Sequence, residues 1–146
     1  MFCYYTNWTQ YRPGAGQFFP EDMPANLCTH IFFSFAYVDQ GSAGWGLRPF
    51  EWNDQDESWM DGLYTRTNAL KRSNPNLKVL LAVGGWNHGN TPFSDMAATE
   101  TGKFTNQSEL RKKYCNLYVC IYVYVISKYS YSRFYSNQGR PDGEQC

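Results

Sequence analysis

The sequence has no excess of charge of either sign and no long apolar run. Lysine and arginine total 13, and aspartate and glutamate total 13, so the formal net charge at pH 7 is zero. Without a basic excess there is no broad positive field to attract nucleic acid or an anionic membrane, and we expect neither partner. The most apolar stretch, residues 117–126, is too short for a membrane-spanning helix, which needs about 20 apolar residues.

The spacing patterns of a metal site are also missing. There are five cysteines and two histidines, but no CxxC pair, and the histidines are far from any second cluster, so we expect no metal and no cofactor. We interpret His30 and His88 as structural. An odd number of cysteines leaves at least one thiol unpaired. Cys3 and Cys28 flank the starts of two strand-like segments. A disulfide between them would close a loop and stabilise the folded chain by about 3 kcal/mol. Such a bond favours an oxidising, secreted setting.

No secretory leader is recognisable at the start of the sequence, because Met1 runs directly into a strand pattern without a basic segment. Glycosylation sequons begin at Asn7 and Asn106. Asn7 falls at the end of a predicted buried strand, so we expect only Asn106 to be an acceptor.

Aromatic residues are what the sequence has in abundance. They form 18% of the chain, and hydrophobic residues as a whole form 42%, so we do not expect most of the chain to be disordered. Sugar rings present apolar C–H faces that stack on flat aromatic side chains, so such residues suit a carbohydrate groove. The same residues serve equally well in a core.

Three apolar segments, 2–6, 29–38 and 77–83, have the composition of buried strands, and the near-continuous run at 29–38 is typical of a parallel strand buried on both faces. The intervening segments predict a loop at 7–19, a helical turn at 21–27, a glycine-rich surface excursion at 41–46, and helices at 54–72, 91–98 and 104–114. This alternation predicts an α/β fold with a parallel sheet. A Rossmann-like sheet and a (β/α)₈ barrel both begin this way.

The composition changes at Cys115. Seven of the twelve tyrosines lie between Tyr114 and Tyr135, and we therefore divide the chain into a first part, 1–114, and a divergent low-complexity tail, 115–146. Residues 117–126 favour a strand and also fit an aggregation-prone segment. We expect this strand to dock beside 77–83 as a surrogate fourth strand, in a chain of marginal stability that is either monomeric or prone to aggregate.

Several motifs follow one another in the first hundred residues: CYYTNW at 3–8, YRPG at 11–14, FFPED at 18–22, LCTHI at 27–31, EWND at 51–54 and LLAVGGWN at 80–87. Together they resemble the opening of glycoside hydrolase family 18 chitinases, most closely those of the animal chitotriosidase and acidic chitinase type. The resemblance implies an incomplete (β/α)₈ TIM barrel consisting of its first three β/α units, secretion, a Cys3–Cys28 disulfide, and a groove for chitin or chito-oligosaccharide at the carboxyl ends of the strands.

Members of this family hydrolyse chitin with the substrate's own acetamido oxygen as nucleophile, and their general acid is the final glutamate of a DxxDxDWE motif. The sequence contains no such motif. The acids at 54–57 have the wrong spacing, and we interpret them as the solvated start of a helix, while Asp142 and Glu144 lie in the tail. We therefore expect no catalytic residue and no activity from the chain as it stands.

The resemblance also carries a set of substrate-binding positions. These are Tyr4, Trp8, Tyr11, Phe35, Glu51, Trp52, Gly84, Gly85, Trp86 and Asn87. On residue type alone, Tyr4 and Phe35 fit a core, Glu51 and Trp52 fit a helix cap, and the two glycines fit a simple turn.

Three functions remain in view. The first is a chitin-binding fragment of a chitinase, and the second is a non-catalytic, lectin-like chitin-binding protein. The third is a nucleotide-binding sheet that uses Gly84 and Gly85, but the GxGxxG pattern and the later acidic residue are missing.

Overall fold

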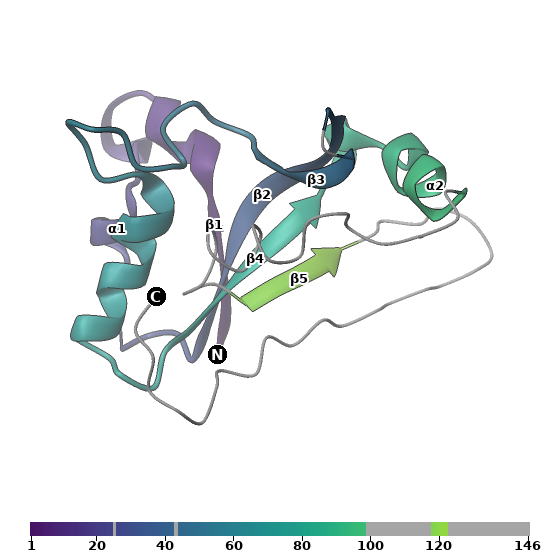
Figure 1. Cartoon of the computed structure of the whole chain (residues 1–146). Coiled ribbons are helices and arrows are strands. Elements are labelled where there is room, and N and C mark those ends of the chain that lie inside the picture. Colours follow the sequence, from purple (N-terminus) through teal and green to yellow (C-terminus); the bar gives the residue numbers. More distant parts are fainter. Residues whose placement is uncertain (25, 43, 99–117, 123–146) are drawn as a thin grey trace.

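The structure is a computed structural model that describes residues 1–24, 26–42, 44–98 and 118–122, the last segment through its backbone alone (Figure 1). Its centre is a single sheet in the order β1-β2-β4-β5, with β3 paired to β2 on a side branch. The strands are β1 (Phe2–Thr6), β2 (His30–Gly41), β3 (Gly44–Pro49), β4 (Lys78–Gly84) and β5 (Tyr118–Tyr122). Strands β1, β2, β4 and β5 run parallel to their neighbours.

The parallel sheet expected from the apolar segments is confirmed, and the strands lie within a few residues of their predicted places. The surrogate fourth strand is confirmed over Tyr118–Tyr122, which pairs with β4 from Leu80 to Gly84. The remainder of the tail and the helix expected at 104–114 lie outside the described residues.

The prediction of a glycine-rich surface excursion at 41–46 is wrong. Strand β2 continues to Gly41, and β3 returns antiparallel beside it, so that Pro49 pairs with Ala36. Trp45 and Leu47 on β3 are buried, which is the period-two pattern of a strand with one face inward. Glycines at the alternate positions, 44 and 46, conceal that pattern in the sequence.

The helix expected at 54–72 begins later than predicted. Helix α1 spans Leu63–Ala69 and continues as the 3₁₀ turn η4 (Leu70–Arg72), while residues 54–62 form a loop. At Gly62 a Cβ atom would collide with the backbone of Asp54 and Gln55, so the chain crosses itself there at a distance that only glycine allows. Interpreting the acids at 54–57 as a solvated helix start is therefore wrong, most clearly for the fully buried Asp54.

Three short 3₁₀ turns lie in the connection after β1, which was expected to be a loop and a helical turn. They are η1 (Asn7–Tyr11), η2 (Gly14–Gly16) and η3 (Pro20–Asp22). After β4 come η5 (Trp86–His88) and helix α2 (Thr91–Ala98), the latter at its predicted place. In the described part of the chain, no helix combines the length and apolar character needed to cross a bilayer.

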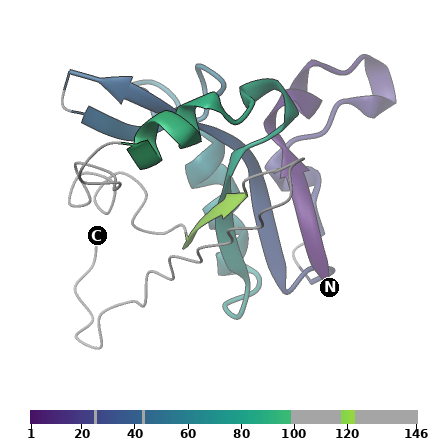
Figure 2. The same ribbon diagram turned by 90° about the vertical axis from the view of Figure 1, so that its right-hand side faces the viewer.

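The core lies between the sheet and α1. Figures 1 and 2 show α1 against one side of the sheet and α2 beyond the end of β4. Cys3 and Cys28 form a disulfide with Cα atoms 5.9 Å apart, the pairing that the resemblance implies. It joins the first residues of β1 to the segment just before β2, at the edge of the core.

Candidate functional site

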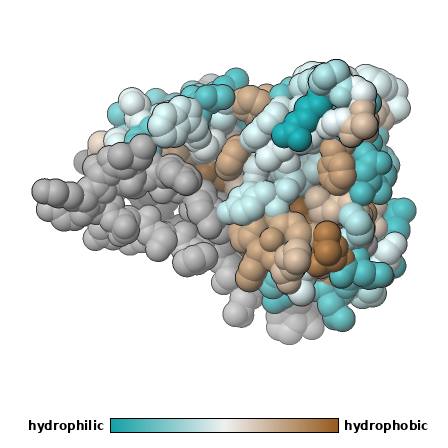
Figure 3. Space-filling model, turned by 180° about the vertical axis from the view of Figure 1, so that it is seen from behind, coloured by the Kyte–Doolittle hydropathy of each residue, from teal (hydrophilic) through white to brown (hydrophobic). Residues whose placement is uncertain are grey.

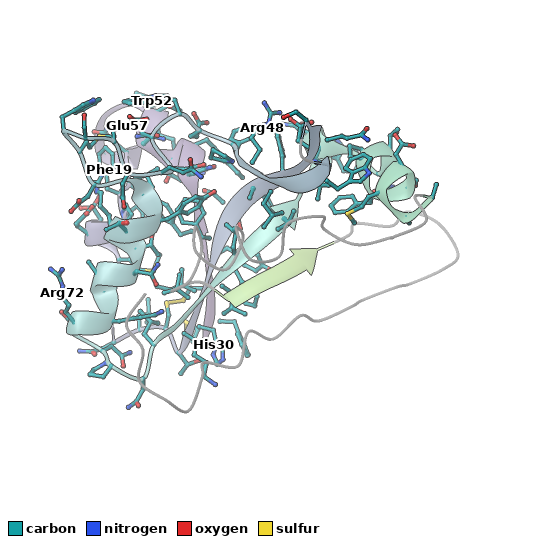
Figure 4. The ribbon with its side chains drawn as sticks, in the orientation of Figure 1. Phe19, His30, Arg48, Trp52, Glu57 and Arg72 are labelled. Atoms are coloured by element: carbon teal, nitrogen blue, oxygen red, sulfur yellow. A yellow bond between two sulfur atoms is a disulfide. The ribbon has the colours of Figure 1, made fainter. Side chains whose placement is uncertain are left out.

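The candidate residues gather at the carboxyl end of the parallel strands. Trp8 and Tyr11 lie in η1 directly after β1, and Trp86 and Asn87 lie in η5 directly after β4. Glu51 and Trp52 follow β3, whose last residue, Pro49, pairs with Ala36 on β2. Figure 4 shows Trp52 at this end of the sheet and His30 at the opposite end. We call Trp8, Tyr11, Phe35, Glu51, Trp52 and Trp86 the aromatic rim.

Phe35 reaches the rim because β2 is irregular at this point. The pairing of β2 with β4 shifts register between Ser34 and Ala36, and such a bulge redirects the side chain at the extra residue. The Ser34–Phe35 peptide bond is cis. The Phe35 ring stacks on Trp8 with centroids 5.9 Å apart and planes at 17°. Phe35 is therefore half-buried at the rim and not in the core that its residue type suggests.

The glycine pair at the end of β4 allows this packing. Gly84 and Gly85 have φ of 104° and 94°, in the region that favours glycine. A Cβ on Gly85 would lie 3.0 Å from Cδ2 of Phe35. Glycine at position 85 is therefore favoured both by the positive φ of the turn and by the close approach of the Phe35 ring.

Tyr11 and Glu51 connect the first and third strand ends. The Tyr11 hydroxyl donates to Oε2 of Glu51 at 2.8 Å. Burial, followed by this hydrogen bond to the carboxylate, raises the pKa of Tyr11 above its ordinary value. The hydrogen bond from Tyr11 therefore fixes the Glu51 carboxylate, a hydrogen-bond acceptor, among exposed aromatic side chains.

Trp52 is exposed and is stacked on a residue that was not among the candidates. Its ring lies 6.2 Å from that of Trp59, with an angle of 27° between the planes. Trp52 is 62% exposed and Trp59 70% exposed. The signal that could have found Trp59 is its place among acidic and polar residues, outside the apolar positions of the predicted helix.

The other three candidates, Trp86, Asn87 and Tyr4, differ in their surroundings. Trp86 is 79% exposed and Asn87 is exposed beside it, so neither packs in the core. Tyr4 lies lower on β1, 50% exposed and stacked on Phe32 with centroids 5.0 Å apart. It is therefore on the face of the sheet that points away from α1.

A buried polar network supports the rim from below. The Asn7 amide donates to both carboxylate oxygens of Asp54, at 3.2 and 2.9 Å. Oδ2 of Asp54 also accepts from the backbone N–H groups of Phe50 and Glu51, at 3.1 and 2.9 Å. Burial raises the pKa of Asp54 to about 7 despite these bonds, which favour the charged form. Asp54 therefore fixes the backbone that presents Glu51.

A second amide pair completes this network. Gln10 and Asn53 exchange side-chain hydrogen bonds of 3.2 and 2.7 Å, and both are buried. Asn7 is fully buried, as expected for the end of a strand. The burial of Gln10, Asn53 and Asp54 was not predicted, because their partners are more than 40 positions away in the sequence.

Histidine and acidic residues do not assemble a metal site in the described segments, where no group of three or more potential ligands comes together. Nε2 of His88 lies 3.0 Å from both the backbone N and the carbonyl O of Val38, so it bonds one or the other according to its tautomer, and the ring packs against Tyr37 and Phe93. His88 thus ties η5 to β2, the structural role expected of it.

Comparison with known proteins gives a consistent result. The family model for glycosyl hydrolases family 18 matches residues 1–118. An endochitinase of Brugia malayi is 48% identical over 104 residues, which are 70% of this chain and 20% of that protein. The solved immunomodulatory active chitinase of Trichuris suis has a TM-score of 0.68 and 40% identity, over 82% of this chain and 31% of that one.

Human YKL-39 is described as a pseudo-chitinase with retained chitooligosaccharide binding. Its structure aligns with a TM-score of 0.64 and 31% identity, over 82% of this chain and 31% of that one. The chain thus spans a fifth of the length of the endochitinase and less than a third of each solved chain. The parallel sheet agrees with these matches, and the chain belongs to glycosyl hydrolases family 18.

Proposed function

We propose that this chain binds chitin or chito-oligosaccharides along the aromatic rim. The observation that carries the proposal is the row of exposed or half-exposed rings at one end of the sheet, with the Tyr11–Glu51 pair among them. Chitin consists of sugar rings with apolar C–H faces and polar edges. Flat aromatic faces with a few fixed polar groups match both features.

The residues divide into two roles. Trp8, Trp52 and Trp86 offer ring faces for stacking. Glu51 and Asn87 offer an acceptor and an amide for sugar hydroxyl and acetamido groups. Gly84, which is buried, and Gly85, which packs against the Phe35 ring, form the turn that would place Trp86 and Asn87 beside a sugar. Phe35, Tyr11 and Tyr4 complete the set of proposed contacts.

We further propose that binding occurs without hydrolysis. The DxxDxDWE motif does not occur in the 146 residues, and Asp54 is occupied by Asn7 and two backbone N–H groups. The retained oligosaccharide binding of the pseudo-chitinase YKL-39 supports a separation of binding from catalysis. Residues 1–114 would then form the opening of a (β/α)₈ barrel and 115–146 a divergent tail, in an extracellular product whose disulfide suits an oxidising compartment.

The test is a chitin pull-down of the full chain together with an assay on a fluorogenic N-acetylglucosamine oligomer. We expect retention on chitin without turnover, and loss of retention in Trp52→Ala. Phe2→Ala, an exposed aromatic residue at the opposite end of β1, is the matched control and should be retained. Equal retention of both variants would overturn the rim as the binding surface, and measurable turnover would overturn the absence of catalysis.

A lectin-like protein would give the same binding result, and YKL-39 is the observation that favours it. The two possibilities differ in the state of the chain. A soluble, monodisperse chain that binds chitin supports a lectin-like function, whereas an insoluble chain supports a fragment of a larger barrel.

A further inference from the structure

The loop at 55–61 is closed at its base. Just outside it, the backbone N–H of Leu63 donates to the carbonyl of Asn53 at 2.9 Å, and that of Tyr64 donates to the carbonyl of Asp54 at 3.0 Å. Gly62 lies against the backbone of residues 54 and 55 with no room for a side chain. The two ends of the loop are therefore held together, as in the compact surface loops that often carry function.

The interior of the loop is fixed as well. Oδ1 of Asp56 accepts from the Gly62 N–H at 2.7 Å, and Oδ2 of Asp56 accepts from the Thr65 hydroxyl at 2.8 Å. Glu57 and Met60 exchange backbone bonds of 2.9 and 3.2 Å. These bonds leave Ser58 and Trp59 at the tip, and Figure 4 shows Glu57 near Trp52 at the same end of the molecule.

The tip residue is a large apolar side chain that the fold leaves in water. Trp59 is 70% exposed, and its ring contact is the displaced stack on Trp52. An exposed indole adds little to the core, yet the loop beneath it is ordered by bonds at its base, middle and tip. Such an arrangement presents a rigid aromatic face, which loses little conformational entropy when a ligand covers it.

Contacts place Trp59 at the outer end of the aromatic rim. Starting from β4, Gly85 touches Phe35, which stacks on Trp8 in the turn η1. Tyr11 of the same turn bonds Glu51, the neighbour of Trp52, and Trp52 stacks on Trp59. The rim therefore continues one aromatic ring beyond Trp52.

We propose that Trp59 is an additional sugar-stacking platform, contacted by longer chito-oligosaccharides after shorter ones have filled the inner rim. This inference rests on the proposed chitin binding. It assigns to the 55–61 loop a role in selecting chain length. Because an aromatic contact contributes about 0.5–1.5 kcal/mol beyond area burial, its removal should weaken the binding of long oligomers by about two- to thirteenfold.

The experiment measures the affinity of the full chain for N-acetylglucosamine oligomers from the disaccharide to the hexasaccharide by calorimetry. The variants are Trp59→Ala and Trp59→Phe. Trp59→Ala should bind the shortest oligomers as the unchanged chain does and the hexasaccharide more weakly, and Trp59→Phe should recover most of the loss. The indole N–H resonance of Trp59, identified by its disappearance in either variant, should shift with hexasaccharide and not with disaccharide.

The outcomes separate this inference from the function on which it rests. If the unchanged chain binds the oligomers and Trp59→Ala binds all of them equally well, the platform is overturned and chitin binding stands. If Trp59→Ala weakens every length to the same degree, Trp59 is not at the outer end and the length-selecting role is wrong. If the unchanged chain binds no oligomer, both proposals fail. Thermal unfolding of each variant verifies that the fold is intact, as expected for a side chain so exposed.

Discussion

The side of the sheet beneath α1 and the side that faces away from it are built from similar residues and are buried very differently. Strand register places neighbouring residues of β1, β2 and β4 in rows across the sheet. The row of Tyr5, Phe33 and Leu81 faces α1, and each of these residues is at most 1% exposed. The adjacent row of Tyr4, Phe32 and Leu80 faces away and is only half-buried or exposed.

The difference shows where the fold obtains its stability. On the covered side, Phe33 meets Tyr64 of α1 edge-on at 4.6 Å and Tyr5 at 5.4 Å. On the open side, aromatic rings meet one another: Tyr4 with Phe32, and Phe2 with both Phe32 and His30. Phe2 remains 66% exposed. Figure 3, seen from behind, shows a patch of hydrophobic surface in the lower middle of the molecule.

Truncating one residue on each side gives the largest predicted contrast. Phe33→Ala should lower the free energy of unfolding by about 3–5 kcal/mol, because it empties a fully packed position beneath α1. Phe2→Ala should change it by about 0.5 kcal/mol, as for most exposed positions. Urea unfolding followed by circular dichroism measures both. Similar losses for the two variants would mean that the open side is packed in solution.

Part of this contrast could be predicted from the sequence and part could not. The three apolar runs correctly predict the parallel strands, because composition reports burial. The run at 29–38 was expected to be buried on both faces, whereas Phe32 is half-buried. A continuous apolar run does not indicate which face of the strand another element covers, because that depends on elements distant in sequence.

The site divides in the same way. Trp52 and Trp86 could be placed at the rim because motifs at strand ends identify them. The burial of Asp54 depends on Asn7, 47 positions earlier, and the exposure of Trp59 depends on how the chain closes at Gly62. Local patterns contain neither fact, so the loop was mistaken for the first turns of a helix.

The disulfide should give the second largest effect. Cys3 and Cys28 enclose a separation of 25 residues, and opening a loop of this size should lower the free energy of unfolding by about 3 kcal/mol. Because the bond lies at the edge of the covered core, Cys3→Ser with Cys28→Ser should sharpen the contrast between the two sides. Unfolding midpoints with and without reductant measure the loss. The double variant serves as the control, since reductant should leave its midpoint unchanged.

Asp54 gives the covered side a dependence on pH. Burial raises its folded-state pKa to about 7, above the unfolded value of 3.8, so folding opposes its ionisation. The contribution of Asp54 to stability is then fully present below about pH 4 and is lost as pH rises through about 7. We expect a loss of about 2 kcal/mol across this range, reduced from the full shift by relaxation of the site. Unfolding midpoints measured from pH 4 to 8 should fall for the unchanged chain and be flatter for Asp54→Asn. An equal slope in both would assign the pH dependence to another group.

The smallest effect is expected where α1 meets η3 at the margin of the covered side. Arg66 donates to both carboxylate oxygens of Glu21 at 2.7 Å, and its guanidinium lies 5.0 Å from the centre of the Phe19 ring. The hydrogen bond from Arg66 lowers the pKa of Glu21 below its ordinary value. The stabilisation is therefore present above about pH 4.5 and is lost as pH falls.

Solvent reaches both partners, with side chains 26% and 54% exposed, so the pair should contribute less than about 1 kcal/mol. Glu21→Gln removes the charge and leaves the contact between Arg66 and Phe19, whereas Arg66→Ala removes both. A double-mutant cycle on unfolding midpoints at pH 7 and pH 3 isolates the ion pair. If the coupling energy approached the fall in the free energy of unfolding caused by Phe33→Ala, the Arg66–Glu21 ion pair would hold α1 as strongly as its apolar face does. A coupling energy that is small at pH 7 and smaller at pH 3 places the attachment of α1 in the packing around Phe33 and Tyr64.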